Sequence, residues 1–303
     1  MTEMAHPKLS IVFLNYNRLE ETRFTVNHLA ALVRGREDIE VIAIDNGSSD
    51  GTPIFLKQHE GWMRLLLLGG NSGIGGLNEG FFLARGDYIM VLDDDSHPVD
   101  AGTLDHLIDI LDHHPHIGVV ACRIESPEGR PVRTWHLPEA DVAGPSTCFV
   151  GCGFAIRRDL FNRIGWFPGE FFLYQNEMET AIRVMKAGFD IYYEPACRVV
   201  HRESGMGRSS WRRVYFPTRN TLWIIRRYFP LSQSIVMIIS RLAFGLIRAA
   251  QSRQIRFYLE AVRDGFGVKI PRETLTIATC RRLNRFKENN NLFYHLKDAL
   301  RVK

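Results

Sequence analysis

The chain has 303 residues, 45% of them hydrophobic and 24% charged, with a net charge of +4 and five cysteines. This length suits one large α/β core with a small appendage, and the composition excludes a largely disordered chain. Five cysteines are too few, and odd in number, for a disulfide framework, and MTEMAHPKLS has no secretory pattern, so we expect a cytoplasmic protein.

The first two thirds of the chain alternate short apolar runs with helical patterns. The runs that predict strands are Leu9–Leu14, Glu40–Ile44, Arg64–Leu68, Tyr88–Leu92, Ile117–Arg123, Phe149–Arg157 and a last strand that begins at Ile191–Tyr193. The spacing predicts helices over 19–33, 77–84, 101–113 and 176–187, and an irregular stretch over 124–147. This alternation indicates an α/β fold with a central, mostly parallel sheet flanked by helices.

Three carboxylates, Asp93, Asp94 and Asp95, follow the apolar run YIMVL directly. Adjacent carboxylates repel one another unless a cation neutralises them, and Mg²⁺ or Mn²⁺ prefers oxygen ligands. Side chains two positions apart on an extended strand point the same way, so Asp93 and Asp95 would share one ion. The alternative is that the acids cap a helix that begins near Val99.

Polar and glycine-rich loops follow the other predicted strands. Asp45 opens such a loop, where its carboxylate would accept the imide N–H of a uracil or thymine; an ordinary Asx turn is the alternative. The loop over 69–76 lets backbone approach a ligand closely. Besides Asp45, the residues that we expect to bind the same ligand are Asn15, Asn17, Asn71, Gly73, Asn78, Asp93 and Asp94.

Cys148 and Cys152 form a C-x3-C pair, but no second Cys/His pair at metal spacing follows. We therefore predict buried small side chains rather than a structural zinc site.

Several motifs together resemble glycosyltransferase family 2, the inverting enzymes with the GT-A fold. They are LSIVFLNYNR, VIAIDNGSSDGT, GGNSGIGGLNEGFFLARGDYIMVLDDD, CFVGCGFAIRRDLF and FFLYQNEMETAIRVMKAG. The resemblance covers roughly residues 8–220. It implies that Asp45 contacts the pyrimidine of a nucleotide donor, Asp93 its ribose or phosphate side, and Asp95 the metal, with His201 completing the metal shell.

The acidic motif that supplies the catalytic base in this family appears here as Asn176-Glu177-Met178-Glu179. Glu177 occupies the position of the base, where Asp is usual, and Glu179 is the second candidate. Either acid would otherwise be an exposed first-turn residue favoured by the helix dipole.

The last hundred residues differ in charge from the rest. Residues 1–200 carry 17 Lys and Arg against 28 Asp and Glu, whereas 201–303 carry 21 against 6. We predict a catalytic domain over 1–225 and a helical extension over 226–303. Within 231–263 the apolar run Ile235–Ile247 is interrupted by Arg241 and is too short and too charged to span a bilayer. Arg241, Arg248, Arg256 and Arg263 would form a basic face, either against an anionic membrane surface or in solvent beside the domain.

These observations predict a metal-dependent glycosyltransferase of the hexosyltransferase type that uses Mg²⁺ or Mn²⁺. The segment YFPTRNTLWIIRRYFP resembles that of rhamnosyltransferase-like members, which implies a dTDP- or UDP-sugar, with rhamnose as a candidate, and a hydroxyl of a lipid-linked or cell-surface glycan. Arg219 there would touch the donor, or only pack at a helix entry. The alternatives are a catalytically idle sugar-nucleotide-binding scaffold and a sugar nucleotidyltransferase; no nucleic-acid partner is expected.

Overall fold

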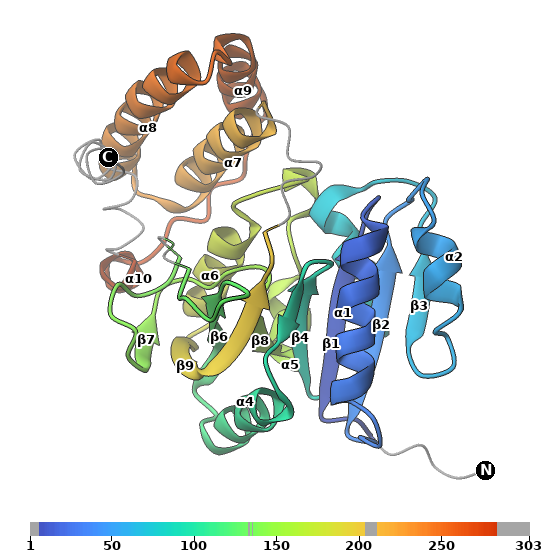
Figure 1. Ribbon diagram of the computed structural model, residues 1–303. Coiled ribbons are helices and arrows are strands. Elements are labelled where there is room, and N and C mark those ends of the chain that lie inside the picture. The colour runs from blue at the N-terminus through green and yellow to red at the C-terminus, as the bar shows by residue number, and fades with distance from the viewer. Residues whose placement is uncertain (1–5, 133, 135, 204–210, 284–303) are drawn as a thin grey trace. The chain divides into compact units, whose positions relative to one another are not determined.

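The structure, a computed structural model, describes residues 6–132, 134, 136–203 and 211–283 (Figure 1). It divides into two compact units, one formed by Met1–Phe172 with Asn176–Met206 and the other by Leu173–Gln175 with Gly207–Lys303. The division falls earlier than the predicted boundary at 225/226. Helix α7 (Arg212–Tyr228) explains the difference, because it contacts α8 (Leu231–Gln251) and α9 (Ile255–Gly267) of the second unit.

The first unit is built on one sheet. Its strands are β1 (Leu9–Asn15), β2 (Ile39–Asp45), β3 (Arg64–Leu67), β4 (Tyr88–Asp93), β5 (Ser96–Pro98), β6 (Ile117–Glu125), β7 (Gly144–Ser146), β8 (Phe154–Arg157) and β9 (Asp190–His201). Its helices are α1 (Leu19–Leu32), α2 (Thr52–Lys57), α3 (Gly76–Leu83), α4 (Ala101–His113), α5 (Arg158–Ile164) and α6 (Asn176–Lys186).

The strand order is β3-β2-β1-β4-β8-β6-β9-β5, with β7 paired to β9. The part β3-β2-β1-β4 is parallel throughout, as is the β6–β9 pair, whereas β8 runs antiparallel to both β4 and β6. Consequently β4, β6 and β9 end at one edge of the sheet, and β8 begins at that same edge. Because of this mixed pairing, the turn that precedes β8 lies next to the ends of β4 and β9.

The core of this unit follows from the apolar runs. Side chains of β1, β2 and β4 are buried almost without a break, as expected for strands covered on both faces. Helix α3 contacts β1 and β2, and α4 contacts β6 and β9. Gly80 permits the first of these contacts, because a Cβ at that position would lie 2.5 Å from the Ile44 side chain.

The helix after the acidic triplet has its own cap. Helix α4 begins at Ala101, and the Asp100 carboxylate accepts a hydrogen bond of 2.8 Å from the Thr103 amide. The short strand β5 lies between the triplet and this helix. The interpretation of Asp93, Asp94 and Asp95 as a helix cap is therefore wrong.

The second unit contains α7, α8, α9 and α10 (Ile277–Arg282). Val214, Ala249 and Tyr258 form one of its buried apolar clusters, and the Tyr258 hydroxyl donates to the Leu242 carbonyl at 2.7 Å. A Cβ at Gly245 would lie 2.9 Å from the Tyr258 ring, so glycine allows α8 and α9 to approach closely. The predicted pattern over 231–263 is interrupted at Arg253, whose φ of 56° ends the continuous helix.

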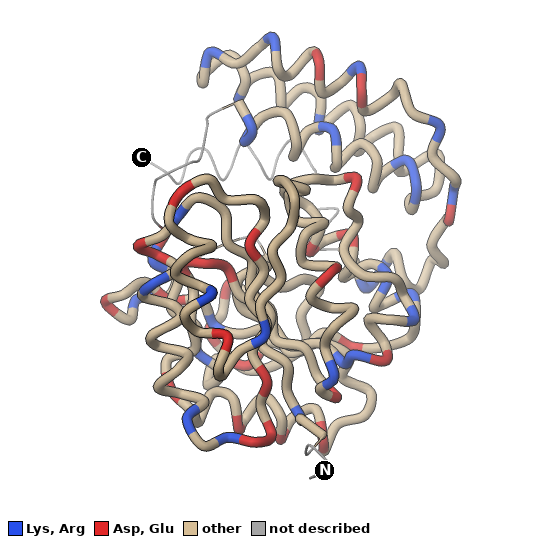
Figure 2. The backbone as a smooth tube through the Cα atoms, turned by 90° about the vertical axis from the view of Figure 1, so that its right-hand side faces the viewer, with Lys and Arg blue, Asp and Glu red and all other residues tan. Residues whose placement is uncertain are grey.

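The exposed side of α8 is mostly apolar, although it also contains Arg248. Its exposed residues include Leu231, Ile235, Val236, Ile239, Leu246 and Ile247, which are between 44% and 67% exposed. Arg241 is instead partly buried, and burial lowers its pKa to about 10. Figure 2 marks the Lys and Arg positions along these helices. The predicted basic face thus excludes Arg241, because the core-facing side of α8 contains it.

Helix α8 is longer than the apolar run that the sequence singles out. Its 21 residues are enough, by length and composition, to cross a membrane, and they correct the prediction that this segment is too short. Core helices of soluble proteins pass the same test, so the finding is weak evidence for a span.

Candidate active site

The ends of two strands and one turn bring three potential ligand groups together. Asp93 ends β4 and His201 ends β9, while Cys152 lies in the turn that precedes β8. The β4–β8 register pairs Val91 with Phe154, and continuing it by two positions puts Cys152 opposite Asp93. One carboxylate oxygen, the Cys152 sulfur and one His201 ring nitrogen all lie within 4.8 Å of one another. Among the described residues this is the group of His, Cys, Asp and Glu side chains placed to hold a metal ion.

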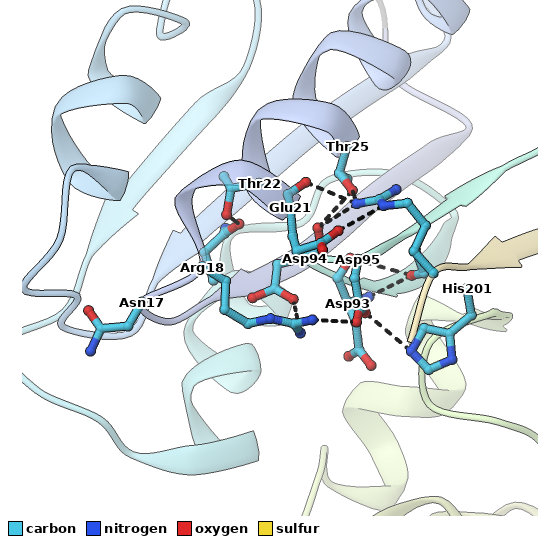
Figure 3. Close-up of polar contacts among 12 residues, drawn as sticks. Asn17, Arg18, Glu21, Thr22, Thr25, Asp93, Asp94, Asp95 and His201 are labelled. Atoms are coloured by element: carbon cyan, nitrogen blue, oxygen red, sulfur yellow. Dashed lines mark hydrogen bonds and ion pairs between the residues drawn. The ribbon is translucent and has the colours of Figure 1, made fainter. Parts of the chain in front are cut away.

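Arg18 pairs with the other two acids of the triplet. Its guanidinium donates to Asp94 Oδ1 and to Asp95 Oδ2, each at 2.6 Å (Figure 3). Arg18 follows β1, so the loop after one strand supplies the counter-ion for acids at the end of its neighbour. Burial raises the pKa of Asp94 well above its usual range even though Arg18 opposes this.

His201 Nε2 lies 3.2 Å from Asp95 Oδ1, on the side of that carboxylate away from Arg18 (Figure 3). Burial disfavours a charged imidazole, but the neighbouring Cys152 and Asp95 outweigh it and raise the pKa of His201 to about 11. Burial would also raise the pKa of Asp95, yet His201 and Arg18 together hold it below its usual range. The side chains predicted as metal ligands, Asp93, Asp95 and His201, therefore lie in one cluster.

Glu177 starts α6 beside the turn that carries Cys152. A Cβ at Gly151 would lie 2.6 Å from Glu177 Oε1, so glycine lets this carboxylate keep its position beside the turn. Burial is the main reason that the pKa of Glu177 rises to about 7, and the charge of Asp93 adds to it. A carboxylate with a pKa near neutrality is suited to accept a proton.

Glu179 has a different environment from Glu177. It is 2% exposed, and its Oε2 lies 2.6 Å from Arg183 Nη2. Arg183 in turn donates to the carbonyls of Ile164 and Trp166. The second candidate base is thus part of an ion pair that attaches α6 to the segment after α5.

The predicted pyrimidine contact, Asp45, ends β2 and is 2% exposed. Its Oδ2 accepts a hydrogen bond of 2.8 Å from the Ser48 amide, so the local turn that was the alternative interpretation is formed. Its buried Oδ1 has no hydrogen-bond partner among the described residues. One acceptor atom of Asp45 thus remains for a ligand.

Two asparagines after β1 hold the loops around Asp45. The Asn15 amide donates to the Ile44 carbonyl at 3.1 Å and its Oδ1 accepts from Thr22. Asn17 accepts hydrogen bonds from the Ser49 and Asp50 amides. These contacts support the loops in the structure; donor contact by either residue stays a prediction.

The glycine-rich loop is held in a similar way. Asn71 Oδ1 accepts from the Gly73 amide at 2.8 Å, and Asn78 makes two hydrogen bonds with the backbone of Phe167. Gly73 has a φ of +61°, and a Cβ there would lie 2.2 Å from the Phe172 carbonyl oxygen. Glycine is therefore required at Gly73 by contacts within the protein itself.

Arg219 lies in α7 of the second unit. Its guanidinium contacts the rings of Tyr215, Phe216 and Trp223 at 5.3, 5.1 and 4.3 Å from their centroids. Cation–π contacts of this kind hold the side chain against its own helix. This environment agrees with the prediction that Arg219 only packs at a helix entry. Contact of Arg219 with the donor stays a prediction.

Sequence reasoning missed Arg18 and Cys152 as parts of the cluster. Arg18 belongs to the motif NYNR, but nothing in the sequence links it to the acids 76 and 77 positions later. All five cysteines are buried, which agrees with the burial expected for Cys148 and Cys152, but Cys152 lies among polar groups of the cluster. The position of Cys152 opposite Asp93 depends on the antiparallel direction of β8.

Comparisons with known proteins support the geometric result. The sequence model of "Glycosyl transferase family 2" matches residues 10–178. A relative from Mycobacterium tuberculosis (strain CDC 1551 / Oshkosh), N-acetylglucosaminyl-diphospho-decaprenol L-rhamnosyltransferase, is 23% identical over an alignment of 207 positions. That alignment covers 55% of this chain and 67% of that protein.

Two solved structures resemble the whole chain. The mannosyltransferase PcManGT from Pyrobaculum calidifontis, in complex with GDP-Man and Mn²⁺, has a TM-score of 0.59 at 17% identity and covers 98% of this chain and 87% of that one. S. aureus TarS 1-349 in complex with UDP-GlcNAc has a TM-score of 0.59 at 16% identity, with 97% and 92% covered. These likenesses confirm the predicted GT-A fold. The family match spans more than half of the chain and includes the sheet edge with Asp45, Asp93 and Glu177, so this protein belongs to glycosyltransferase family 2.

Proposed function

We propose that this glycosyltransferase transfers a sugar from a nucleoside diphosphate donor to a hydroxyl of a lipid-linked or cell-surface glycan. A divalent cation would be bound by Asp93 and His201, with Asp95 positioning His201. Ligand atoms of Asp93 and His201 lie within 4.8 Å of each other, and Asp95 lies 3.2 Å from His201. The observation that carries the proposal is the convergence of these side chains with Glu177 at one edge of the sheet. The donor set fits a divalent ion, since carboxylate oxygen and imidazole nitrogen are ordinary ligands of Mn²⁺ and related ions. When bound, such a cation stabilises the negative charge of the diphosphate leaving group.

The reaction also needs a base that accepts the proton of the acceptor hydroxyl. Glu177, with a pKa near 7, accepts the proton of the acceptor hydroxyl as that oxygen attacks the anomeric carbon. The carbon–oxygen bond to the diphosphate breaks in the same displacement, which inverts the configuration. Glu179 is the less suitable base, because Arg183 already occupies its carboxylate.

The nucleotide end of the donor is assigned to Asp45. Its unsatisfied Oδ1 suits the imide N–H that uracil and thymine share. The Mycobacterium tuberculosis relative is named as an L-rhamnosyltransferase that acts on a lipid-linked sugar, and the TarS structure contains UDP-GlcNAc. We therefore propose a dTDP- or UDP-sugar as the donor, with dTDP-rhamnose as the first candidate.

Transfer from a panel of nucleotide sugars tests this function. The purified chain with Mn²⁺ should be stabilised by one pyrimidine-linked donor in a thermal-shift screen, and that donor should be consumed when a polyprenyl-diphospho-sugar is added. Glu177→Gln should bind the donor with unchanged affinity and lose transfer. Binding without transfer in the unaltered chain, across the acceptors tried, would instead favour the sugar-nucleotide-binding scaffold.

We also propose that the apolar side of α8 contacts the inner face of the cell membrane, where a lipid-linked acceptor would lie. Exposed Ile235, Val236 and Ile239 would enter the interface, and the exposed Arg256 and Arg263 suit anionic headgroups. Flotation with anionic vesicles should show binding that weakens at high salt and is lost in Ile239→Asp. Ile54→Asp, which changes an equally exposed isoleucine in α2, is the matched control and should float normally. Equal flotation of both variants would refute the assignment to α8.

A further inference from the structure

The turn before β8 carries a thiol that the proposed reaction does not use. Val150 and Gly153 form an isolated antiparallel bridge, and the Gly153 amide donates to the Val150 carbonyl at 3.1 Å. This tight turn leaves Cys152 1% exposed and directs it toward the ends of β4 and β9. The same turn contains Gly151, which leaves space for Glu177.

Cys152 faces polar groups, although a buried cysteine usually packs among apolar side chains. Its sulfur hydrogen-bonds the His201 ring, and it lies within the 4.8 Å cluster with Asp93. Cys148, four positions earlier, has a different environment, because its sulfur contacts the Phe149 carbonyl at 3.5 Å. The C-x3-C pair is therefore split between two environments, and only one of its members belongs to the cluster in the described chain.

Both carboxylate oxygens of Asp95 already have partners, which leaves the Cys152 thiol as the third candidate ligand. Asp95 directs one oxygen to Arg18 and the other to His201, so its carboxylate is the polar partner of a neighbouring ligand. A carboxylate behind a histidine orients the ring of many metal ligands. Asp93, His201 and Cys152 are therefore the three residues whose ligand atoms, a carboxylate oxygen, an imidazole nitrogen and a sulfur, lie around a common point.

We propose that Cys152 is a thiolate ligand of the divalent cation, beside Asp93 and His201. The inference rests on the proposed metal-dependent function and adds a soft donor to its site. Thiolate favours Zn²⁺, Co²⁺ and similar ions, whereas Mg²⁺ takes oxygen ligands and keeps several waters. The site should consequently bind Zn²⁺ and Co²⁺ more tightly than Mg²⁺, to an extent that depends on this one sulfur.

Metal spectroscopy on the full chain tests the ligand directly. Metal-free protein titrated with Co²⁺ should develop near-ultraviolet absorption from sulfur-to-cobalt charge transfer. In zinc-loaded protein, X-ray absorption should show a zinc–sulfur distance of about 2.3 Å. All five cysteines are buried, so no exposed thiol competes for the ion. The zinc measurement uses the unaltered chain and does not depend on any variant remaining folded.

Two variants assign the signal to one sulfur. Cys152→Ser should lose the charge-transfer absorption and bind Co²⁺ at least about 10- to 100-fold more weakly. Removal of a residue that only hydrogen-bonds to a metal ligand already weakens metal binding by about this much, so removal of a ligand should cost no less. Cys148→Ser, the matched control, should keep both the absorption and the affinity. Mg²⁺ binding should be the same in all three proteins.

Cation binding without a sulfur signal in the unaltered chain would overturn this inference and leave the proposed function intact. Persistence of the signal in Cys152→Ser would also overturn it. If calorimetry detects no association with Co²⁺, Zn²⁺ or Mn²⁺ at all, both the inference and the metal-dependent function fail.

Discussion

Replacement of Glu177 by glutamine tests the proposed base most directly. Glutamine keeps the size of the side chain but accepts no proton at this position, so kcat should fall by roughly 10²- to 10⁴-fold, the usual contribution of a general base. The donor KM should change little, because Glu177 is assigned to the acceptor side. Glu60→Gln changes an exposed glutamate far along the chain and is the control.

The pKa of Glu177 also predicts how strongly the rate of the unaltered enzyme changes with pH. Burial, with a smaller contribution from Asp93, raises the pKa of Glu177 from 4.5 to about 7. The ionised fraction of such a group rises from about one tenth at pH 6 to about nine tenths at pH 8, so the rate should increase roughly ninefold over this interval. A rate that is already constant above pH 5.5 would show an ordinary carboxylate and refute the assignment.

The same pKa has a consequence for stability. Because the folded state holds the proton of Glu177 more tightly than the unfolded state does, the free energy of unfolding decreases as pH rises from 4.5 through about 7. Glu177→Gln removes this loss. Its Tm should exceed that of the unaltered chain at pH 8 and match it at pH 4, as measured by calorimetry without metal. An equal difference at both pH values would contradict the raised pKa of Glu177.

Three further predictions concern the surroundings of the site. Asp95→Asn should abolish metal-dependent turnover and weaken Mn²⁺ binding in calorimetry, because His201 loses its carboxylate partner; unchanged Mn²⁺ affinity would contradict this. Arg18→Met leaves Asp94 buried without its counter-ion and leaves Asp95 with His201 alone, so it should lower stability by about 3–5 kcal/mol in urea unfolding, and Mn²⁺ should restore part of the loss. A loss below about 1 kcal/mol would show that the ion pairs of Arg18 with Asp94 and Asp95 contribute little to stability. Asn78→Ala removes both hydrogen bonds to the Phe167 backbone and should cost about 1–3 kcal/mol in the same assay, whereas unchanged unfolding would show that water replaces them.

The parallel part of the sheet is predictable from the sequence. The runs over Leu9–Leu14, Glu40–Ile44 and Tyr88–Leu92 each lie within an observed strand or extend one by a single residue, because strands covered on both faces are continuously apolar. The polar residues that end them fall at one edge for the same reason. The acidic triplet and Asp45 could therefore be placed at the site without a structure.

The second half of the sheet is less predictable. The predicted strand Phe149–Arg157 contains a turn, and β8 occupies only Phe154–Arg157. The short strand β5 forms because it pairs with β9, about a hundred positions later, and no local pattern of three residues reveals such a pairing. Helices α2 and α5 were also missed, since six or seven residues give too little periodicity.

The residues missed at the site depend on these long-range pairings. Cys152 reaches Asp93 only because β8 runs antiparallel to β4, a direction that the sequence does not specify. Arg18 reaches Asp94 and Asp95 because β1 and β4 are neighbours in the strand order. In both cases the residue type was visible, and its partner was not.

The arginine bridge between Asp94 and Asp95 has a consequence for the enzyme when no cation is bound. A chain that pairs two of its buried carboxylates with its own guanidinium has a partner for both of them before any cation binds. If the proposed cation is required for transfer, its removal should stop the reaction and leave the paired carboxylates, and with them the fold, in place.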